Sequence, residues 1–96
     1  MDRTAARLIN ILLNNDENAA VVEMHFPAPE IVFEKDCLFA VGGGDLGMNL
    51  NGLDAENWRI HRASKGSILK FQEKRQGERA YLAVRGGFQV EKWLDS

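Results

Sequence analysis

The sequence is poor in the residues that form covalent or metal cross-links. It has one cysteine, Cys37, which cannot form an internal disulfide, and its two histidines are not at metal-ligand spacing from it. We therefore expect no metal site and a reducing, cytoplasmic location. No apolar run approaches the roughly 20 residues of a membrane span or resembles a signal-peptide core, so neither membrane insertion nor secretion is expected.

The sequence also lacks an excess of charge of either sign. Its 12 basic and 14 acidic residues nearly balance, and no basic stripe is interleaved with aromatic residues. This composition argues against a nucleic-acid partner and against a polybasic membrane surface. The 96 residues, 45% of them hydrophobic, are enough for a single globular domain over residues 1–96 with one core.

An amphipathic helix is predicted at the N-terminus. Asp2 has the residue type of an N-cap, and the apolar residues after it have the i, i+3, i+4, i+7 spacing of one helix face. These apolar residues are Ala5, Leu8, Ile9 and Leu12. The helix should end near Asn14 and Asn15, because asparagine tolerates the left-handed conformation that ends helices.

Short strands separated by turns are predicted for the rest of the chain. The β-prone runs are residues 21–26, 31–33, 37–41, 46–50, 58–61, 67–72 and 79–85. Turn signals lie at Asn51-Gly52, Lys65-Gly66 and Gln76-Gly77. Helices do not alternate with strands, so the predicted fold class is mainly β: a closed or partly open barrel, or a sandwich, with the N-terminal helix added.

The clearest two-faced strand is predicted over residues 79–85. Its apolar face consists of Ala80, Leu82 and Val84. Arg79, Tyr81 and Arg85 lie on the other face, and Gly86 and Gly87 follow the strand. Two guanidiniums and a phenol are suited to binding a carboxylate or a carbonyl oxygen, so we predict a substrate-binding face closed off by the two glycines. The alternative is a solvated face whose arginines form only weak surface ion pairs.

A cluster of glycines at residues 42–47 contains the G-x-G-x-x-G pattern. No helix is predicted after it, so a dinucleotide site is rejected and a wide turn or bulge is predicted. Asp45 would then satisfy amides of that turn. In the functional alternative, the glycines form one side of a substrate site, where the missing side chains let a small substrate come close to the backbone. Asp45 would then be an orienting carboxylate.

Other candidate residues are less strongly indicated. Glu23 and His25 are two residues apart on one strand, so they share a face and could act as an acid–base pair, although a solvated pair is the commoner explanation. Cys37 lies in an apolar strand, where a buried, inert thiol is expected. Trp58 and Trp93 are predicted to be core or interface anchors rather than stacking platforms.

Several segments agree, in their order, with one known family. They are Met1-Asp2-Arg3, the stretch from Asn15 to Glu23, Gly43-x-Asp45-Leu46-Gly47 and the stretch from Arg79 to Gly87. In these motifs the chain resembles the biotin-dependent carboxyltransferase-like family, whose members are variously called the C-type subunit of 5-oxoprolinase, allophanate hydrolase subunit 2 or Kip antagonist. The resemblance covers nearly the whole chain.

The resemblance implies a cyclophilin-like β-barrel, the first barrel of a longer two-barrel subunit. It also implies a function: with a sibling subunit of the B type and a third subunit, the family carries out ATP-dependent opening of 5-oxoproline to glutamate. Related domains transfer a carboxyl group from biotin to urea. In this scheme Asp2, Glu23 and Asp45 would be acid–base or orienting groups, and Arg79 and Tyr81 would contact a small amide or lactam. We expect this chain to bind no cofactor itself, with ATP, and biotin where it is used, held elsewhere in the intact complex.

The sequence departs from the family pattern in ways that leave alternatives open. Gly42 and Gly44 stand where threonine and alanine are more usual, and Asp95 stands where glycine is usual. The flanking segments and the second barrel of the family are absent, so the isolated chain is expected to be inactive. A second hypothesis is therefore a non-catalytic module that binds the sibling subunit or itself through an exposed helix face. That face would be formed by Leu8, Leu12 and Leu13. A piece of a longer protein without function of its own is a third possibility.

Overall fold

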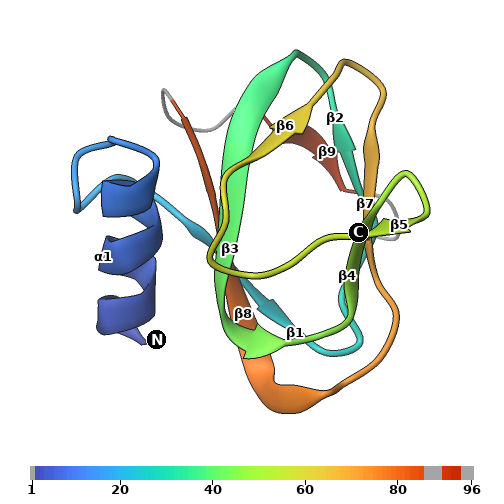
Figure 1. The fold of residues 1–96 in the computed structure, drawn as a ribbon, viewed down its shortest axis with the longest axis horizontal. Helices are drawn as coiled ribbons and strands as arrows, with labels where there is room; N and C mark the ends of the chain where they lie inside the picture. Colours follow the sequence, from blue (N-terminus) through green and yellow to red (C-terminus); the bar gives the residue numbers. More distant parts are fainter. Residues whose placement is uncertain (1, 86–89, 94–96) are drawn as a thin grey trace.

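The computed structural model describes residues 2–85 in full and the backbone of residues 90–93 (Figure 1). Helix α1 covers Arg3–Leu12. The strands are β1 (Val22–His25), β2 (Ile31–Phe33), β3 (Cys37–Asp45), β4 (Met48–Leu50), β5 (Leu53–Asp54), β6 (His61–Ala63), β7 (Ile68–Phe71), β8 (Gln76–Val84) and β9 (Val90–Trp93). The predicted fold class, mainly β with an N-terminal helix, is confirmed.

The strands form two antiparallel sheets that face each other. One has the order β1-β8-β3-β6 and the other the order β5-β4-β7-β2-β9. Figure 1 shows α1 on the outer side of β3 and β8, away from the second sheet. Within the described residues no strand of one sheet pairs with a strand of the other, so the barrel is partly open rather than closed.

The main core lies between the two sheets. Its fully buried side chains come from both sheets and include Ile31, Phe33, Phe39, Val41, Leu69, Leu82 and Ala63. Ala80, Leu82 and Val84 of β8 all point into this core, which confirms the predicted apolar face of that strand. The period-two alternation identified these residues because one face of β8 must bury its side chains against the opposite sheet.

A second, smaller core lies on the outer face of the first sheet, under α1. Ala5, Ile9 and Leu13 of the helix region pack there against Ala40, Tyr81 and Ala83. Tyr81 is only 2% exposed, so the prediction of an open polar face along β8 is wrong in the middle of the strand. The alanines at this face are small enough for a helix to pack closely over it, which the strand pattern by itself did not reveal.

The helix buries only half of the apolar face predicted for it: Ala5 and Ile9 are buried as expected, but Leu8 and Leu12 are exposed. Ala5, Ala6, Ile9 and Leu13 are buried, whereas Leu8, Ile11 and Leu12 are 49%, 53% and 38% exposed. The helix therefore carries apolar residues on two sides, and helical spacing could not tell which side faces the sheet. The buried stripe is the one that contains the small alanines of the first turn. Leu13, predicted on an exposed face, belongs to the core.

Both ends of α1 are fixed by hydrogen bonds. At the start, the Asp2 carboxylate accepts a hydrogen bond of 3.1 Å from the Ala5 N–H, which confirms the predicted N-cap. At the end, Asn14 has a left-handed φ of 61°, as predicted. The side-chain amide of Asn15 donates to the Val84 carbonyl at 2.9 Å, which ties the helix terminus to β8.

The Asn10 side chain fastens the loop that follows the helix. Asn10 is fully buried, and its amide donates to the Ala19 carbonyl at 2.8 Å. Its side-chain oxygen accepts a hydrogen bond of 3.2 Å from Asn15. A buried amide is tolerated here because both its donor and its acceptor have partners.

The predicted turns have mixed outcomes. The Asn51-Gly52 turn is confirmed, with φ values of 52° and 86° that fit a type I′ hairpin between β4 and β5. Gly66 also has the positive φ of a turn residue. Gln76-Gly77, however, is not a turn but the start of β8, opposite a bulge in β3. The glycine segment 42–44 likewise lies inside β3, so the predicted wide turn is wrong and the predicted bulge is confirmed.

Two strand boundaries also differ from prediction. The strand predicted over residues 58–61 begins only at His61, because Trp58 has a φ of 65° and lies in the loop before β6. Strands β5 and β9 were not predicted; β5 has only two residues. In the described part of the chain, no helix has the length and apolar character needed to span a bilayer.

The helix orientation is tested by two identical substitutions. Ile9→Ala should lower the free energy of unfolding by about 2–5 kcal/mol, because it leaves a cavity under α1. Ile11→Ala, on the other side of the helix and 53% exposed, should cost less than about 1 kcal/mol. Urea denaturation of both variants measures the difference. Equal losses would contradict the helix orientation.

Candidate functional site

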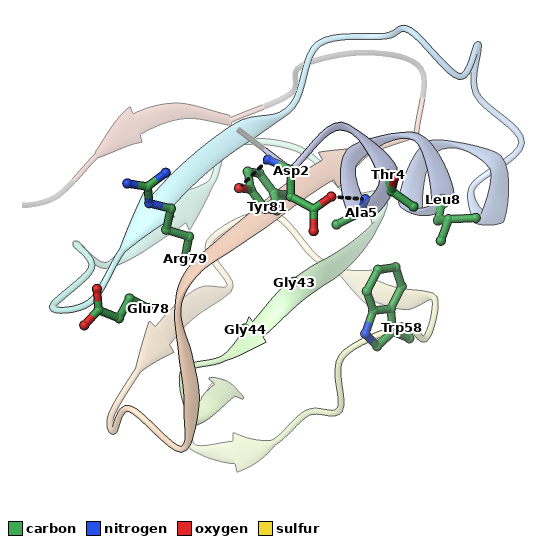
Figure 2. Close-up of a pocket in the computed structure, with 10 residues that line it drawn as sticks. All are labelled: Asp2, Thr4, Ala5, Leu8, Gly43, Gly44, Trp58, Glu78, Arg79 and Tyr81. Atoms are coloured by element: carbon green, nitrogen blue, oxygen red, sulfur yellow. Dashed lines mark hydrogen bonds between the residues drawn. The ribbon is translucent and has the colours of Figure 1, made fainter.

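A groove of about 850 Å³ opens where α1 begins (Figure 2). It lies between the first turn of the helix, the glycine segment of β3, the early part of β8 and the loop before β6. The residues that line it are Asp2, Thr4, Ala5, Leu8, Gly43, Gly44, Trp58, Glu78, Arg79 and Tyr81. This volume is in the range of small-molecule binding sites, about 300–1,000 Å³.

Gly43 allows the floor of the groove to form. Its φ is 90°, and a Cβ atom there would be 3.0 Å from both the Arg79 carbonyl oxygen and the Tyr81 ring. A side chain at Gly44 would be 2.8 Å from the backbone oxygens of Arg79 and Gln76. The glycines therefore let β8 approach β3 closely and leave bare backbone facing the groove.

Tyr81 connects this floor to the helix. Its ring is buried next to Gly43, and its hydroxyl oxygen accepts a hydrogen bond of 2.8 Å from the Asp2 backbone N–H. Figure 2 shows Asp2 and Tyr81 side by side above the glycine strand. Within the described residues the Tyr81 O–H donates no hydrogen bond, so this proton can be donated to a ligand.

Arg79 supplies the cationic group of the groove. Its side chain is 55% exposed, and its guanidinium is 3.9 Å from the Glu23 carboxylate. Glu23 also lies 3.2 Å from His25, and β1 and β8 pair so that His25 is opposite Arg79. At 3.9 Å the contact is longer than a hydrogen bond and of little energetic value at the surface, so the guanidinium can turn toward a ligand.

A carboxylate lies at the same end of the groove as Arg79. Glu78 makes an ion pair of 2.7 Å with Lys74, and this hydrogen bond lowers the pKa of Glu78. Glu78 is consequently ionised at neutral pH. The groove thus presents charges of both signs at one end and polar N–H and O–H groups at its centre.

The opposite wall of the groove is apolar. Trp58 and Leu8 form it, and they are 43% and 49% exposed. The Trp58 backbone N–H donates to the Val41 carbonyl at 2.8 Å, and the Asn57 amide donates to the Gly44 carbonyl at 2.9 Å. These two bonds hold the loop against β3.

Trp58 can occupy this position because residue 42 is a glycine. A Cβ atom at Gly42 would be 2.6 Å from the Trp58 ring and 2.7 Å from Ile9. Any side chain at residue 42 would therefore require the Trp58 and Ile9 side chains to move. The sequence pattern placed Trp58 among core or interface anchors, and its role as a groove wall was missed.

The predicted site residues do not all come together. Asp2, Arg79 and Tyr81 line the groove, and Glu23 lies beside it through its contact with Arg79. Asp45 is not among the lining residues; its carboxylate accepts a hydrogen bond of 3.0 Å from the Gly47 N–H, the structural interpretation considered for it. The catalytic roles of Asp2, Glu23 and Asp45 stay predictions.

Arg85, the C-terminal residue of the predicted binding face, does not line this groove. Arg85 is six residues beyond Arg79, about 20 Å along an extended strand, so both arginines cannot hold one small substrate. Gly86 and Gly87 lie outside the described residues. Glu78, which lines the groove, was not predicted; its position before Arg79 on an exposed strand gave no distinguishing signal.

A second groove, of about 450 Å³, lies near Arg85. Its lining residues are Asp36, Cys37, Leu38, Arg62 and Arg85. Burial, and to a smaller extent the charge of Asp36, raises the pKa of the Cys37 thiol. The predicted burial of Cys37 is only partial, since it has intermediate exposure and lines this groove, but its thiol is neutral at physiological pH. In the described part of the chain, no group of three or more His, Cys, Asp and Glu side chains could hold a metal ion.

Fold and groove together define a class: a mainly β domain with a ligand-sized groove between a helix N-terminus and a glycine-bearing strand. Comparison with known proteins gives the family. The family described as "Carboxyltransferase domain, subdomain A and B" matches residues 1–96, and the chain belongs to it. The resemblance noted in the sequence is thereby confirmed.

Several relatives are known by name. Urea amidolyase of Saccharomyces cerevisiae is 33% identical over 96 residues, covering 100% of this chain and 5% of the relative. The C-type subunit of 5-oxoprolinase from Haemophilus influenzae is also 33% identical, covering 100% of this chain and 31% of the relative. The crystal structure of the K. lactis urea amidolyase matches with a TM-score of 0.85 at 30% identity, covering 100% of this chain and 6% of that one. The chain therefore corresponds to a small part of each of these proteins.

Proposed function

We propose that this chain is the part of a carboxyltransferase-type enzyme that binds the carbonyl or carboxylate of a small amide or lactam. The preferred substrate is 5-oxoproline, opened to glutamate in an ATP-dependent system; a urea or allophanate system is the related alternative. The observation that carries the proposal is the convergence of Arg79, Tyr81 and the glycine floor on one groove. The names of the relatives, urea amidolyase and 5-oxoprolinase, support the substrate class.

The groove offers the donors that ring opening requires. When a nucleophile adds to an amide carbonyl, negative charge develops on the oxygen, and fixed donors stabilise it. Tyr81 is held rigidly by its buried ring and its bond to Asp2, so its O–H serves as such a donor. Arg79 is less constrained and suits the substrate carboxylate, which it can bind in bidentate fashion. Trp58 would cover the apolar part of the substrate.

Proton transfer is assigned to the carboxylates near Arg79 and the helix. One oxygen of Asp2 is engaged as the helix N-cap, which fixes its orientation. Glu23 contacts both His25 and Arg79, so it can exchange a proton with the imidazole while remaining beside the substrate-binding guanidinium. We propose Asp2 as an orienting group and the Glu23 and His25 pair as the acid–base pair.

The lining of the groove does not fit a nucleoside triphosphate. Asp2 and Glu78 place two carboxylates there against the single guanidinium of Arg79, and none of the described residues that line it is a lysine. A triphosphate would require the opposite balance of charge. We therefore place the ATP-dependent step, and any biotin, on the remainder of the intact enzyme, which would include a sibling subunit of the B type and a third subunit.

The proposal is tested by Arg79→Gln, measured in the complex reconstituted with its partner subunits and ATP. Loss of a charge-assisted contact should lower kcat/KM for 5-oxoproline about 10- to 100-fold without changing assembly. Arg75→Gln is the matched control, because Arg75 is 49% exposed and paired with Glu73 outside the groove. Unchanged turnover by an intact Arg79→Gln complex would refute the catalytic proposal.

A second proposed function, a non-catalytic assembly module, is favoured by the exposed stripe of α1. Leu8, Ile11 and Leu12 are apolar and exposed on a helix that lies outside both sheets. Exposed apolar residues grouped in this way commonly mark a contact surface. The sibling subunit or a second copy of the chain would cover them. Leu13, predicted from the sequence to belong to this face, is buried and takes no part.

The double variant Ile11→Gln/Leu12→Gln tests this module while leaving Leu8 in the groove intact. Loss of two apolar contacts should weaken association with the sibling subunit at least about tenfold in Kd, measured by sedimentation or light scattering. Leu53→Gln, at a 75% exposed position on β5, is the control and should associate normally. Undiminished association of the double variant would count against an interface on this stripe.

A further inference from the structure

Two arginines lie on either side of Leu38 at the end of the first sheet remote from the candidate groove. Strands β3 and β6 pair so that Leu38 is opposite Arg62. On the other side of β3, the Arg85 backbone N–H donates to the Leu38 carbonyl at 2.9 Å. Phe39 pairs with Val84, so Arg85 continues the same register. The three residues therefore form a row across adjacent strands, and directly opposed residues in such rows project to the same face.

Neither guanidinium has an acidic partner within the described residues. The ion pairs of the arginines there involve Arg7, Arg59, Arg75 and Arg79 only. Asp36 lines the same groove as Arg62 and Arg85, but it accepts a hydrogen bond of 2.7 Å from the Lys65 backbone N–H. One carboxylate, engaged in this turn, does not balance two guanidiniums. Among the described residues, the row thus keeps positive charge without an acidic partner beside an apolar side chain.

We propose that Arg62 and Arg85 together bind a small oxyanion, the phosphate or carboxylate group of a ligand seated over Leu38. Guanidiniums on either side of one strand can donate to such a group from two directions. The groove that they line, about 450 Å³, is large enough for a small anion with an apolar portion. Its separation from Arg79, about 20 Å along β8, makes it a site distinct from the first groove.

Two further groups affect the charge at the site. The neighbouring Cys37 thiol is neutral, because burial and the charge of Asp36 raise its pKa, so it adds no negative charge. Asp36 is the acidic side chain that lines this groove, and its hydrogen bond to Lys65 would be preserved by asparagine. The Asp36 carboxylate opposes an anion at this site, and its charge can be removed without removing the turn that holds it.

The test is an NMR titration of the ¹⁵N-labelled chain with inorganic phosphate and, separately, with malonate at constant ionic strength. We expect the Arg62 and Arg85 side-chain N–H signals to shift together with at least one probe. Arg62→Gln and Arg85→Gln should each weaken that binding about tenfold, and Asp36→Asn should strengthen it. Arg59→Gln, whose guanidinium pairs with Glu56 elsewhere, should have no effect. The stronger probe identifies the ligand group as phosphate or carboxylate.

The proposal is overturned if neither probe shifts these signals, or if Arg59→Gln weakens binding as much as the other two variants. It is also overturned if the shifts spread equally over all arginines, which would indicate screening by salt. Amide spectra of each variant confirm that the fold is retained. Because the titration needs no substrate and no partner subunit, its result is independent of the function proposed for the first groove.

Discussion

The close approach of β8 to β3 at Gly43 positions the Tyr81 ring, the start of α1 and the groove between them. A Cβ atom at residue 43 would be only 3.0 Å from both the Arg79 carbonyl oxygen and the Tyr81 ring, and the φ of 90° also favours glycine there. With its ring packed beside Gly43, Tyr81 accepts a hydrogen bond through its hydroxyl oxygen from the Asp2 backbone N–H at the start of α1. The groove forms where the start of α1 meets β3 and β8. Gly43 thus lies next to the ring whose hydroxyl contacts the helix N-terminus and is the proposed donor.

The helix is consequently held to β8 at both ends. Tyr81 binds its N-cap residue, Asp2, and the Val84 carbonyl accepts the hydrogen bond from Asn15 beyond its last turn. Between these points Ile9 packs on the alanines of the sheet. One stripe of the helix is buried by this arrangement while the other, with Ile11 and Leu12, stays exposed. In the proposed functions, substrate binding would use the N-terminal end of the helix, where Leu8 lines the groove, and assembly would use Ile11 and Leu12 nearer its C-terminal end.

The sequence predicted those features that depend on neighbouring residues. Alternation identified the core face of β8, and Asn51-Gly52 identified a hairpin, because both patterns follow from local backbone geometry. Features set by packing were missed. Which stripe of α1 is buried depends on the sheet beneath it, and the glycine segment looked like a turn although its neighbour is another strand. The site was predicted in part: Asp2, Arg79 and Tyr81 meet in the groove, but strand length separates Arg85 from them.

The central claim is that contact at Gly43, and not only its backbone conformation, builds the groove. Gly43→Ala and Gly66→Ala separate the two effects, because their φ values are 90° and 89° while a Cβ atom at Gly66 would meet nothing within 4 Å. Urea denaturation should show a loss of about 1–3 kcal/mol for Gly66→Ala from backbone strain alone. Gly43→Ala should lose about 1–3 kcal/mol more, because the added methyl group overpacks the contact with β8. Equal losses for the two variants would contradict the account.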